Sequence, residues 1–233
     1  MKTSFNILLA LVLSSLTLLA APTTDRFSSG IEPDDSNTID TIGTDTTKYT
    51  YLDIVVDDDE LFLDNLGFYY KINDDGEAAT FYGTYDYMLG DEELKNSLTG
   101  DLEIPSVVNH NGTDYPVIEI GYNAFYDCSG LTSVSIPDSV TKISTGAFSR
   151  CSGLTSVSIP NSVTEIGYNV FFGCDGLQEI CCLIANPDKI VLGDDVFEGV
   201  NVASCVLYVP TEAVKKYKAL KPWNEFIIRP LHE

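Results

Sequence analysis

Histidine and basic residues are scarce in this sequence, and their scarcity argues against several classes of function. The 233 residues include 2 His, and 13 Lys or Arg against 35 Asp or Glu, so the formal net charge is −22. Such a composition predicts no basic surface for a nucleic-acid backbone, and an anionic membrane surface repels the chain as a whole. Two histidines leave little for proton transfer or zinc chemistry. The 44% of hydrophobic residues, in contrast, suffices for one or two modest domains with a core.

Long apolar runs are absent beyond the first 21 residues. Lys2 is followed by the mostly apolar stretch Ile7–Leu19 and then by two alanines, which is the pattern of a secretory signal peptide. Two serines and a threonine interrupt the stretch, whereas a membrane span needs about 20 apolar residues. We therefore predict a signal peptide over residues 1–21 and an exported product that is secreted or extracytoplasmic at the cell surface. We expect no membrane insertion after cleavage.

The next segment, residues 22–48, is rich in Thr, Ser and Asp. It has too little apolar surface to offset the entropy of ordering, so we predict a flexible linker. The acidic run Asp57–Glu60 lacks the spacing of a calcium-binding loop, and we interpret it as a solvated turn.

An internal repeat organises the middle of the chain. The segment Cys128–Val140 recurs as Cys151–Val163 with 12 of 13 positions identical, at an offset of 23 residues. An apolar residue followed by Phe keeps the same step, at Phe125, Phe148 and Phe171. Self-similarity at such a period is typical of a solenoid.

Each unit has a simple physical interpretation. Leu131, Val134 and Ile136 are apolar, and the small polar Ser133 and Ser135 lie between them, which predicts a short strand with one buried face. Pro137 ends the strand, and the apolar residues after it predict a tight, partly helical return. The fold class we expect is α/β, as a short leucine-rich-repeat solenoid of about five parallel strand rungs with a β cap and a helical cap.

The expected domains follow from this repeat. Residues 49–100 form an N-terminal β-rich capping region containing a strand–turn–strand over residues 68–82, and residues 101–210 form the solenoid. Residues 211–233 form a C-terminal cap in which Thr211 caps a short helix. Asn111–Gly112 predicts a hairpin turn.

The repeat unit at Cys128–Phe148, C-S-G-L-T-S-V-S-I-P-x-S-V-T-x-I-x-x-x-A-F, resembles the leucine-rich repeat of the BspA-like family of bacterial exported and surface proteins. The ending Cys205–Pro210, followed by Tyr217 and Trp223, resembles the terminal unit of those proteins. The similarity covers roughly residues 67–229. It implies a curved α/β solenoid on an exported protein, and members of the family have been linked to adhesion to host matrix proteins and to other cells.

The cysteines have two interpretations. Cys128, Cys151 and Cys174 recur at the repeat step on the apolar side, which favours a ladder of buried free thiols over disulfides. Cys182 is expected to point inward and Cys181 outward, and a disulfide from either to Cys205 stays open.

No constellation of residues indicates catalysis, a metal site or a cofactor. His110 lies beside the predicted turn and His232 near the end of the chain, and neither has a catalytic motif around it. Nothing in the spacing of the acidic residues distinguishes a glycosidase pair from surface charge.

The outward strand face is the candidate binding surface, with a protein or glycan on a host or cell surface as the expected ligand. The register predicts two rows across the strands, and their candidate binding residues are Glu103, Ser133, Ser135, Ser156, Ser158, Glu179 and Tyr208. The hypothesis is non-enzymatic protein or cell-surface recognition, including adhesion to host matrix proteins. The alternatives are a structural scaffold for another cell-envelope protein and, with less support, a glycan or peptide hydrolase.

Overall fold

The computed structural model describes residues 61–63, 68–83 and 98–231. Compactness divides the chain into residues 1–58 and 59–233, and every described residue belongs to the second unit. The predicted signal peptide, the linker, the acidic run at residues 57–60 and His232 lie outside the described residues. Among the residues that are described, no helix is long and apolar enough to cross a membrane.

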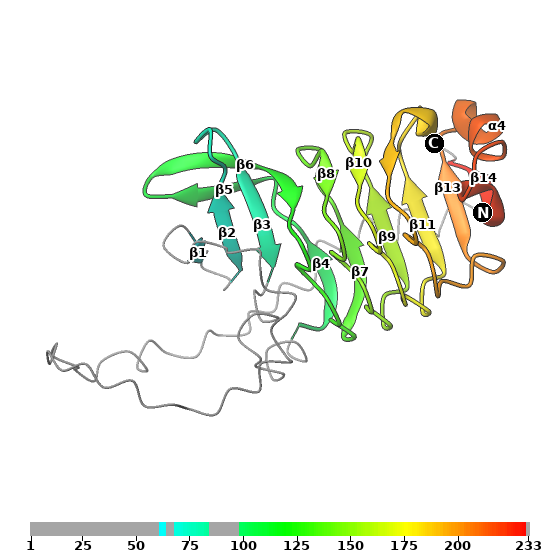
Figure 1. Cartoon of the computed structure of the whole chain (residues 1–233), viewed down its shortest axis with the longest axis horizontal. Helices are drawn as coiled ribbons and strands as arrows, with labels where there is room; N and C mark the ends of the chain where they lie inside the picture. Colours follow the sequence, from blue (N-terminus) through cyan, green and yellow to red (C-terminus); the bar gives the residue numbers. More distant parts are fainter. Residues whose placement is uncertain (1–60, 64–67, 84–97, 232–233) are drawn as a thin grey trace, which may run out of the picture. The chain divides into compact units, whose positions relative to one another are not determined.

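Six parallel strands form one sheet, which we call sheet B (Figure 1). Its register pairs Val134 with Val157 and Ile180 with Leu207, so the apolar residues of successive units share one buried face. The sequence repeat indicates five of these strands, and the sixth, β14, lies beyond the last unit. In spatial order the strands are β4 (Gly100–Glu103), β7 (Leu131–Ser135), β9 (Ser156–Ile159), β11 (Glu179–Cys182), β13 (Val206–Val209) and β14 (Ile227–Pro230).

The return segments form a second sheet, sheet A. The predicted partly helical return is wrong, because each regular unit returns through a two-residue strand followed by hydrogen-bonded turns. The expected α/β class therefore overstates the helix content, and the described residues are mostly strands in parallel sheets. Sheet A contains β1 (Leu61–Leu63), β2 (Tyr69–Ile72), β3 (Ala79–Gly83), β6 (Thr113–Ile120), β8 (Lys142–Ile143), β10 (Glu165–Ile166) and β12 (Val191–Leu192).

Left-handed backbone explains why the return cannot be a helix. Each unit has two residues with positive φ that lie four positions apart, such as Gly146 (φ 69°) and Arg150 (φ 63°). An α-helix cannot contain such residues in its interior. A Cβ at Gly146 would lie 2.0 Å from the Asn123 side-chain oxygen, so a larger residue there would require Asn123 to move.

Stacked aromatic rings run through the core between the two sheets. The rings of Phe125, Phe148, Phe171 and Phe197 follow one another at centroid distances of 5.2, 5.6 and 5.8 Å and are nearly parallel. Beside them the thiol of Cys151 donates to the carbonyl oxygen of Phe125, one unit earlier. The Cys174 thiol donates to the Phe148 carbonyl in the same way, so the repeated cysteines form a ladder of hydrogen-bonded thiols.

The N-terminal end of the solenoid contains two hairpins. β2 and β3 pair antiparallel, and β3 joins sheet A by pairing in parallel with β6. The second hairpin joins β5 (Val107–His110) to β6, and its turn residues Asn111 and Gly112 both have positive φ, as the predicted turn requires.

The C-terminal end contains short helical turns. They are η2 (Pro187–Lys189), η3 (Thr211–Ala213), α4 (Val214–Tyr217) and η4 (Trp223–Glu225). Thr211 caps none of them, since its hydroxyl donates instead to the carbonyl oxygen of Leu231. Trp223 is buried and packs edge-on against Phe197, at the end of the aromatic stack.

The register also answers the open disulfide question. Cys181 pairs with Tyr208, three residues beyond Cys205, so Cys205 is displaced along the strands by about 10 Å from Cys181 and about 13 Å from Cys182. A disulfide requires Cα atoms within about 7 Å, and all six cysteines are free thiols.

Candidate binding surface

The outward face of sheet B carries two continuous rows of side chains, which we call the strand-face strip. The first row joins Ser133, Ser156, Glu179 and Val206, as the sequence indicates. The second joins Glu103, Ser135, Ser158, Cys181 and Tyr208. Glu103, Ser135 and Glu179 are exposed, whereas Ser133, Ser156, Ser158 and Tyr208 are half-buried.

Three members of the strip were missed by sequence reasoning. Asp101 pairs with Ser133, while Ile227 and Arg229 of β14 pair with Val206 and Tyr208. The register shifts between Gly100 and Asp101, so the position of Asp101 does not follow from the repeat. No repeat copy covers β14.

Hydrogen bonds fix the acidic end of the strip. The hydroxyls of Thr132 and Ser133 both donate to Asp101 Oδ1, at 2.8 and 2.7 Å. The carboxylate is thereby held beside β7, and its remaining acceptor positions face solvent. Asp101 and Glu103 make this face acidic on β4, Glu179 adds a negative charge on β11, and Arg229 supplies positive charge on β14.

The cysteine within the strip is a poor nucleophile. Partial burial raises the pKa of Cys181, opposed by a hydrogen bond from Ser158 and assisted by the charge of Glu179. Because the thiolate is the reactive form, this environment disfavours nucleophilic chemistry. In the described ranges, no group of three or more His, Cys, Asp or Glu is placed to hold a metal ion.

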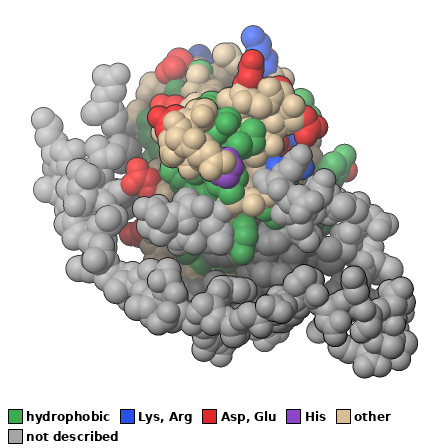
Figure 2. Space-filling model, turned by 90° about the vertical axis from the view of Figure 1, so that its left-hand side faces the viewer, with side chains coloured by type: hydrophobic (Ala, Val, Ile, Leu, Met, Phe, Trp, Pro, Cys, Tyr) green, Lys and Arg blue, Asp and Glu red, His purple; other side chains and the backbone are tan. Residues whose placement is uncertain are grey.

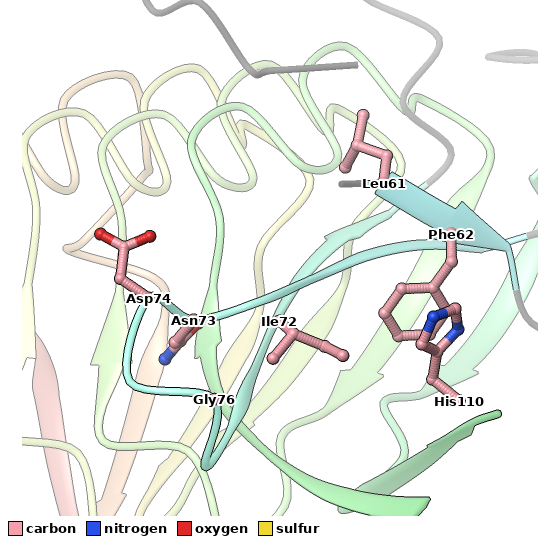
Figure 3. A pocket seen from close by; sticks show the side chains of 7 residues that line it. All are labelled: Leu61, Phe62, Ile72, Asn73, Asp74, Gly76 and His110. Carbon is pink, nitrogen blue, oxygen red and sulfur yellow. The ribbon is translucent and has the colours of Figure 1, made fainter. Parts of the chain in front are cut away.

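A pocket of about 350 Å³ opens at the N-terminal end. His110 packs against Phe62 with ring centroids 4.1 Å apart, and hydrophobic side chains lie beside the histidine on this face (Figure 2). Asp74 lies at one end of the pocket and the Phe62–His110 pair at the other, with Ile72 between them (Figure 3). Sequence reasoning missed this pocket because its walls come from three segments far apart in the chain.

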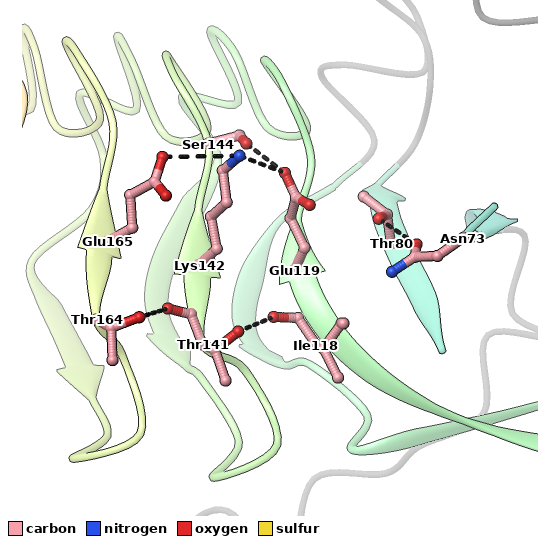
Figure 4. A network of polar contacts seen from close by, with 9 residues as sticks. All are labelled: Asn73, Thr80, Ile118, Glu119, Thr141, Lys142, Ser144, Thr164 and Glu165. Carbon is pink, nitrogen blue, oxygen red and sulfur yellow. Dashed lines mark hydrogen bonds and ion pairs between the residues drawn. The ribbon is translucent and has the colours of Figure 1, made fainter. Parts of the chain in front are cut away.

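The outer face of sheet A differs in that its charged side chains are paired with one another. Lys142 lies 3.6 Å from both Glu119 and Glu165, and Ser144 donates a hydrogen bond to Glu119 (Figure 4). Thr164 donates to the carbonyl oxygen of Thr141 in the neighbouring unit. These groups form ion pairs and hydrogen bonds within the chain, so the strand-face strip is the better candidate for contact with a partner.

Comparison with known proteins identifies the repeat. The model of the BspA-type leucine-rich-repeat region matches residues 111–217 with six copies. A leucine-rich repeat protein from Bacteroides capillosus is 30% identical, and the match covers 64% of this chain and 98% of that one with a TM-score of 0.51. The chain belongs to the BspA-type leucine-rich-repeat family.

Two further solved structures show similarity to this chain. A leucine-rich repeat protein from Bacteroides ovatus is 24% identical, with 73% of this chain and 41% of that chain covered and a TM-score of 0.50. A protein described as a leucine rich cell surface protein, from Faecalibacterium prausnitzii, is 25% identical over 66% of this chain and 38% of its own, with a TM-score of 0.45. No curated protein matches the chain significantly. The matched residues contain β7, β9, β11 and β13 of sheet B, whereas the two edge strands β4 and β14 lie outside the match.

Proposed function

We propose that this BspA-type protein is a non-enzymatic recognition module outside the cell and that it binds a protein or glycan through the strand-face strip. The observation that carries the proposal is the strip itself, two rows in which hydroxyl and carboxylate groups predominate, held in register by six paired strands. The signal peptide expected at residues 1–21 supports export, and the family supports a role in recognition.

The size of the strip sets the strength expected of one contact. Six strands about 4.8 Å apart and about 12 Å long give on the order of 300 Å². A stable protein interface needs about 800 Å² from each partner. A single strip therefore binds weakly, and tight binding requires neighbouring surfaces or many copies.

Binding to a panel of host matrix proteins and glycans tests the proposal. The assay is run at physiological and at about threefold higher salt, because nonspecific contacts of an acidic chain are screened by salt. We expect saturable, salt-resistant binding to one ligand. Binding to none, together with co-purification of a protein from the same cell envelope, would favour the scaffold alternative.

The strip is assigned by a matched pair of variants. Ser135→Arg with Ser158→Arg places two large cations on neighbouring strands of the strip, and we expect affinity for the identified ligand to fall at least about tenfold. Thr141→Arg with Thr164→Arg makes the same change, at the same 23-residue spacing, on the sheet A side and should leave affinity unchanged. Equal affinity of both variants and the parent chain would contradict the assignment.

A further inference from the structure

The pocket at the N-terminal end combines apolar walls with polar groups at both of its ends. Its volume is about 350 Å³. Half-buried Leu61, Phe62 and Ile72, from β1 and β2, supply the apolar surface. A Cβ built at Gly76 would meet no atom within 4 Å, so the space beside the β2–β3 turn is open. The lining residues are all different from those of the strand-face strip, and the pocket is therefore a separate candidate for a ligand.

The β2–β3 turn supplies a hydrogen-bond acceptor that the fold does not use. Two neighbouring aspartates lie in this turn, and Asp75 Oδ1 accepts the backbone N–H of Glu77 at 3.0 Å. Asp74 lines the pocket and is exposed, and among the described residues its carboxylate makes no hydrogen bond or ion pair. An ionised carboxylate only accepts hydrogen bonds. A ligand group beside Asp74 must therefore be a donor.

Two other lining residues are left as donors. Asn73 Oδ1 accepts the hydroxyl of Thr80 at 2.9 Å, so the amide NH₂ of Asn73 is the group that remains for a ligand. His110 Nε2 lies 2.9 Å from Asn111 Nδ2. Because the amide nitrogen donates, Nε2 accepts and the ring hydrogen is carried by Nδ1. Ligand groups beside Asn73 and His110 must therefore be acceptors.

We propose that this pocket binds one sugar residue of a neutral glycan. Sugar hydroxyls both donate and accept hydrogen bonds, so neighbouring hydroxyls can bond to Asp74 and to Asn73 together. The C–H groups of the sugar ring supply an apolar face for Ile72 and Phe62, which lie between Asp74 and His110 or beside it (Figure 3). This inference does not rest on the proposed function, because the pocket and the strip share no residue.

Charged ligands match the pocket less well. An organic cation carries donors only, so it satisfies Asp74 and leaves the donors of Asn73 and His110 without acceptors. An organic anion satisfies those donors, but Asp74 repels it. A neutral ligand with both kinds of group is the one class that satisfies all three residues. A sugar residue of about 12 non-hydrogen atoms in such an open pocket is expected to bind with a Kd of about 1 mM.

Titration with simple sugars tests the proposal. The probes are the methyl glycosides of glucose, galactose, mannose, fucose and N-acetylglucosamine, added to the exported form of the chain and followed by saturation-transfer NMR. We expect saturable binding of at least one glycoside, unchanged at about threefold higher salt because the ligand carries no charge to be screened. Asp74→Ala removes the acceptor and should lower the affinity about tenfold. His110→Phe keeps a ring beside Phe62, removes the N–H donor and should lower the affinity about fivefold.

Two controls separate the pocket from other surfaces. Glu77→Ala removes a carboxylate from the same turn, where it is exposed and outside the pocket, and should leave sugar binding unchanged. Ser135→Arg with Ser158→Arg alters the strip and should also leave it unchanged.

Three outcomes would overturn the proposal. The first is absence of binding to every glycoside at about ten times the expected Kd. The second is binding that Asp74→Ala does not weaken. The third is tighter binding of spermidine than of any glycoside, lost at high salt and in Asp74→Ala, which would show that the pocket takes an organic cation instead.

Discussion

At the scale of single residues, stability concentrates in the aromatic stack. Phe148 is fully buried and lies between two parallel rings, with its neighbours on each side one unit away. We expect Phe148→Ala to lower the free energy of unfolding by about 3–5 kcal/mol, because it removes the buried ring and leaves a cavity. Chemical denaturation followed by circular dichroism measures the change.

Tyr168 supplies the control for this prediction. Its side chain is 56% exposed, so Tyr168→Ala should change the free energy of unfolding by about 0.5 kcal/mol or less. Equal losses for the two variants would contradict the assignment of the stack as the main source of stability.

At the scale of elements, the repeat predicted the strands of sheet B and failed on the returns. Alternation of apolar and small polar residues identifies a strand, and the 23-residue step fixes its register, so most of the strip could be predicted before the fold was known. The returns have strands of only two residues, too short to alternate. Their left-handed positions are occupied by Asn, Asp and Arg as well as Gly, so no single residue type marks them.

Two further features escaped prediction for a different reason. β14 lies outside every repeat copy and ends in proline, which suggests a terminus rather than a strand. The pocket beside His110 depends on packing between hairpins that have no sequence relation to one another. A local sequence pattern predicts contacts that recur in every unit, whereas β14 and the pocket each occur once.

The thiol ladder predicts a dependence of stability on pH. Burial raises the pKa of Cys174 from its ordinary value of 9.0 to about 12. A hydrogen bond with the backbone of Cys151 partly offsets this rise. Above pH 9 the unfolded chain ionises this thiol while the folded chain keeps it protonated. The stabilisation is therefore fully present below pH 9 and is lost as the pH rises toward 12.

Cys174→Val isolates this contribution. Val200 occupies the corresponding position of the next unit and is buried there, so valine fits the site. We expect the free energy of unfolding of the variant to lie within about 1.5 kcal/mol of the parent at pH 7. It should fall less than that of the parent between pH 8 and 11. Parallel pH profiles for the two chains would show that the thiol does not titrate on unfolding.

At the scale of the whole described unit, each repeat contacts mainly its neighbours. The backbone and side-chain bonds join equivalent residues 23 positions apart, as from Thr155 to Thr132 and from Thr164 to Thr141. The ends differ, since hairpins complete one and buried Tyr217 and Trp223 complete the other. Stability of such a stack is approximately a sum of units and of the contacts between adjacent units.

Removal of one unit should therefore be tolerated. Deletion of residues 141–163 joins Val140 to Thr164, which reproduces the sequence junction of the parent chain. It leaves Phe125 to stack on Phe171. We expect a shorter chain that still unfolds cooperatively, with lower stability than the parent, as measured by thermal and chemical denaturation. Loss of cooperative unfolding would indicate that the units are not equivalent.

The near identity of the segments that begin at Cys128 and Cys151 has a consequence for how this molecule changes over generations. After duplication or loss of one 23-residue stretch, each unit still lies next to a unit of nearly the same sequence as before. The length of the strand-face strip is thus a variable that one genetic event can alter. Point substitutions at the exposed serines can then diversify copies that share the same buried residues.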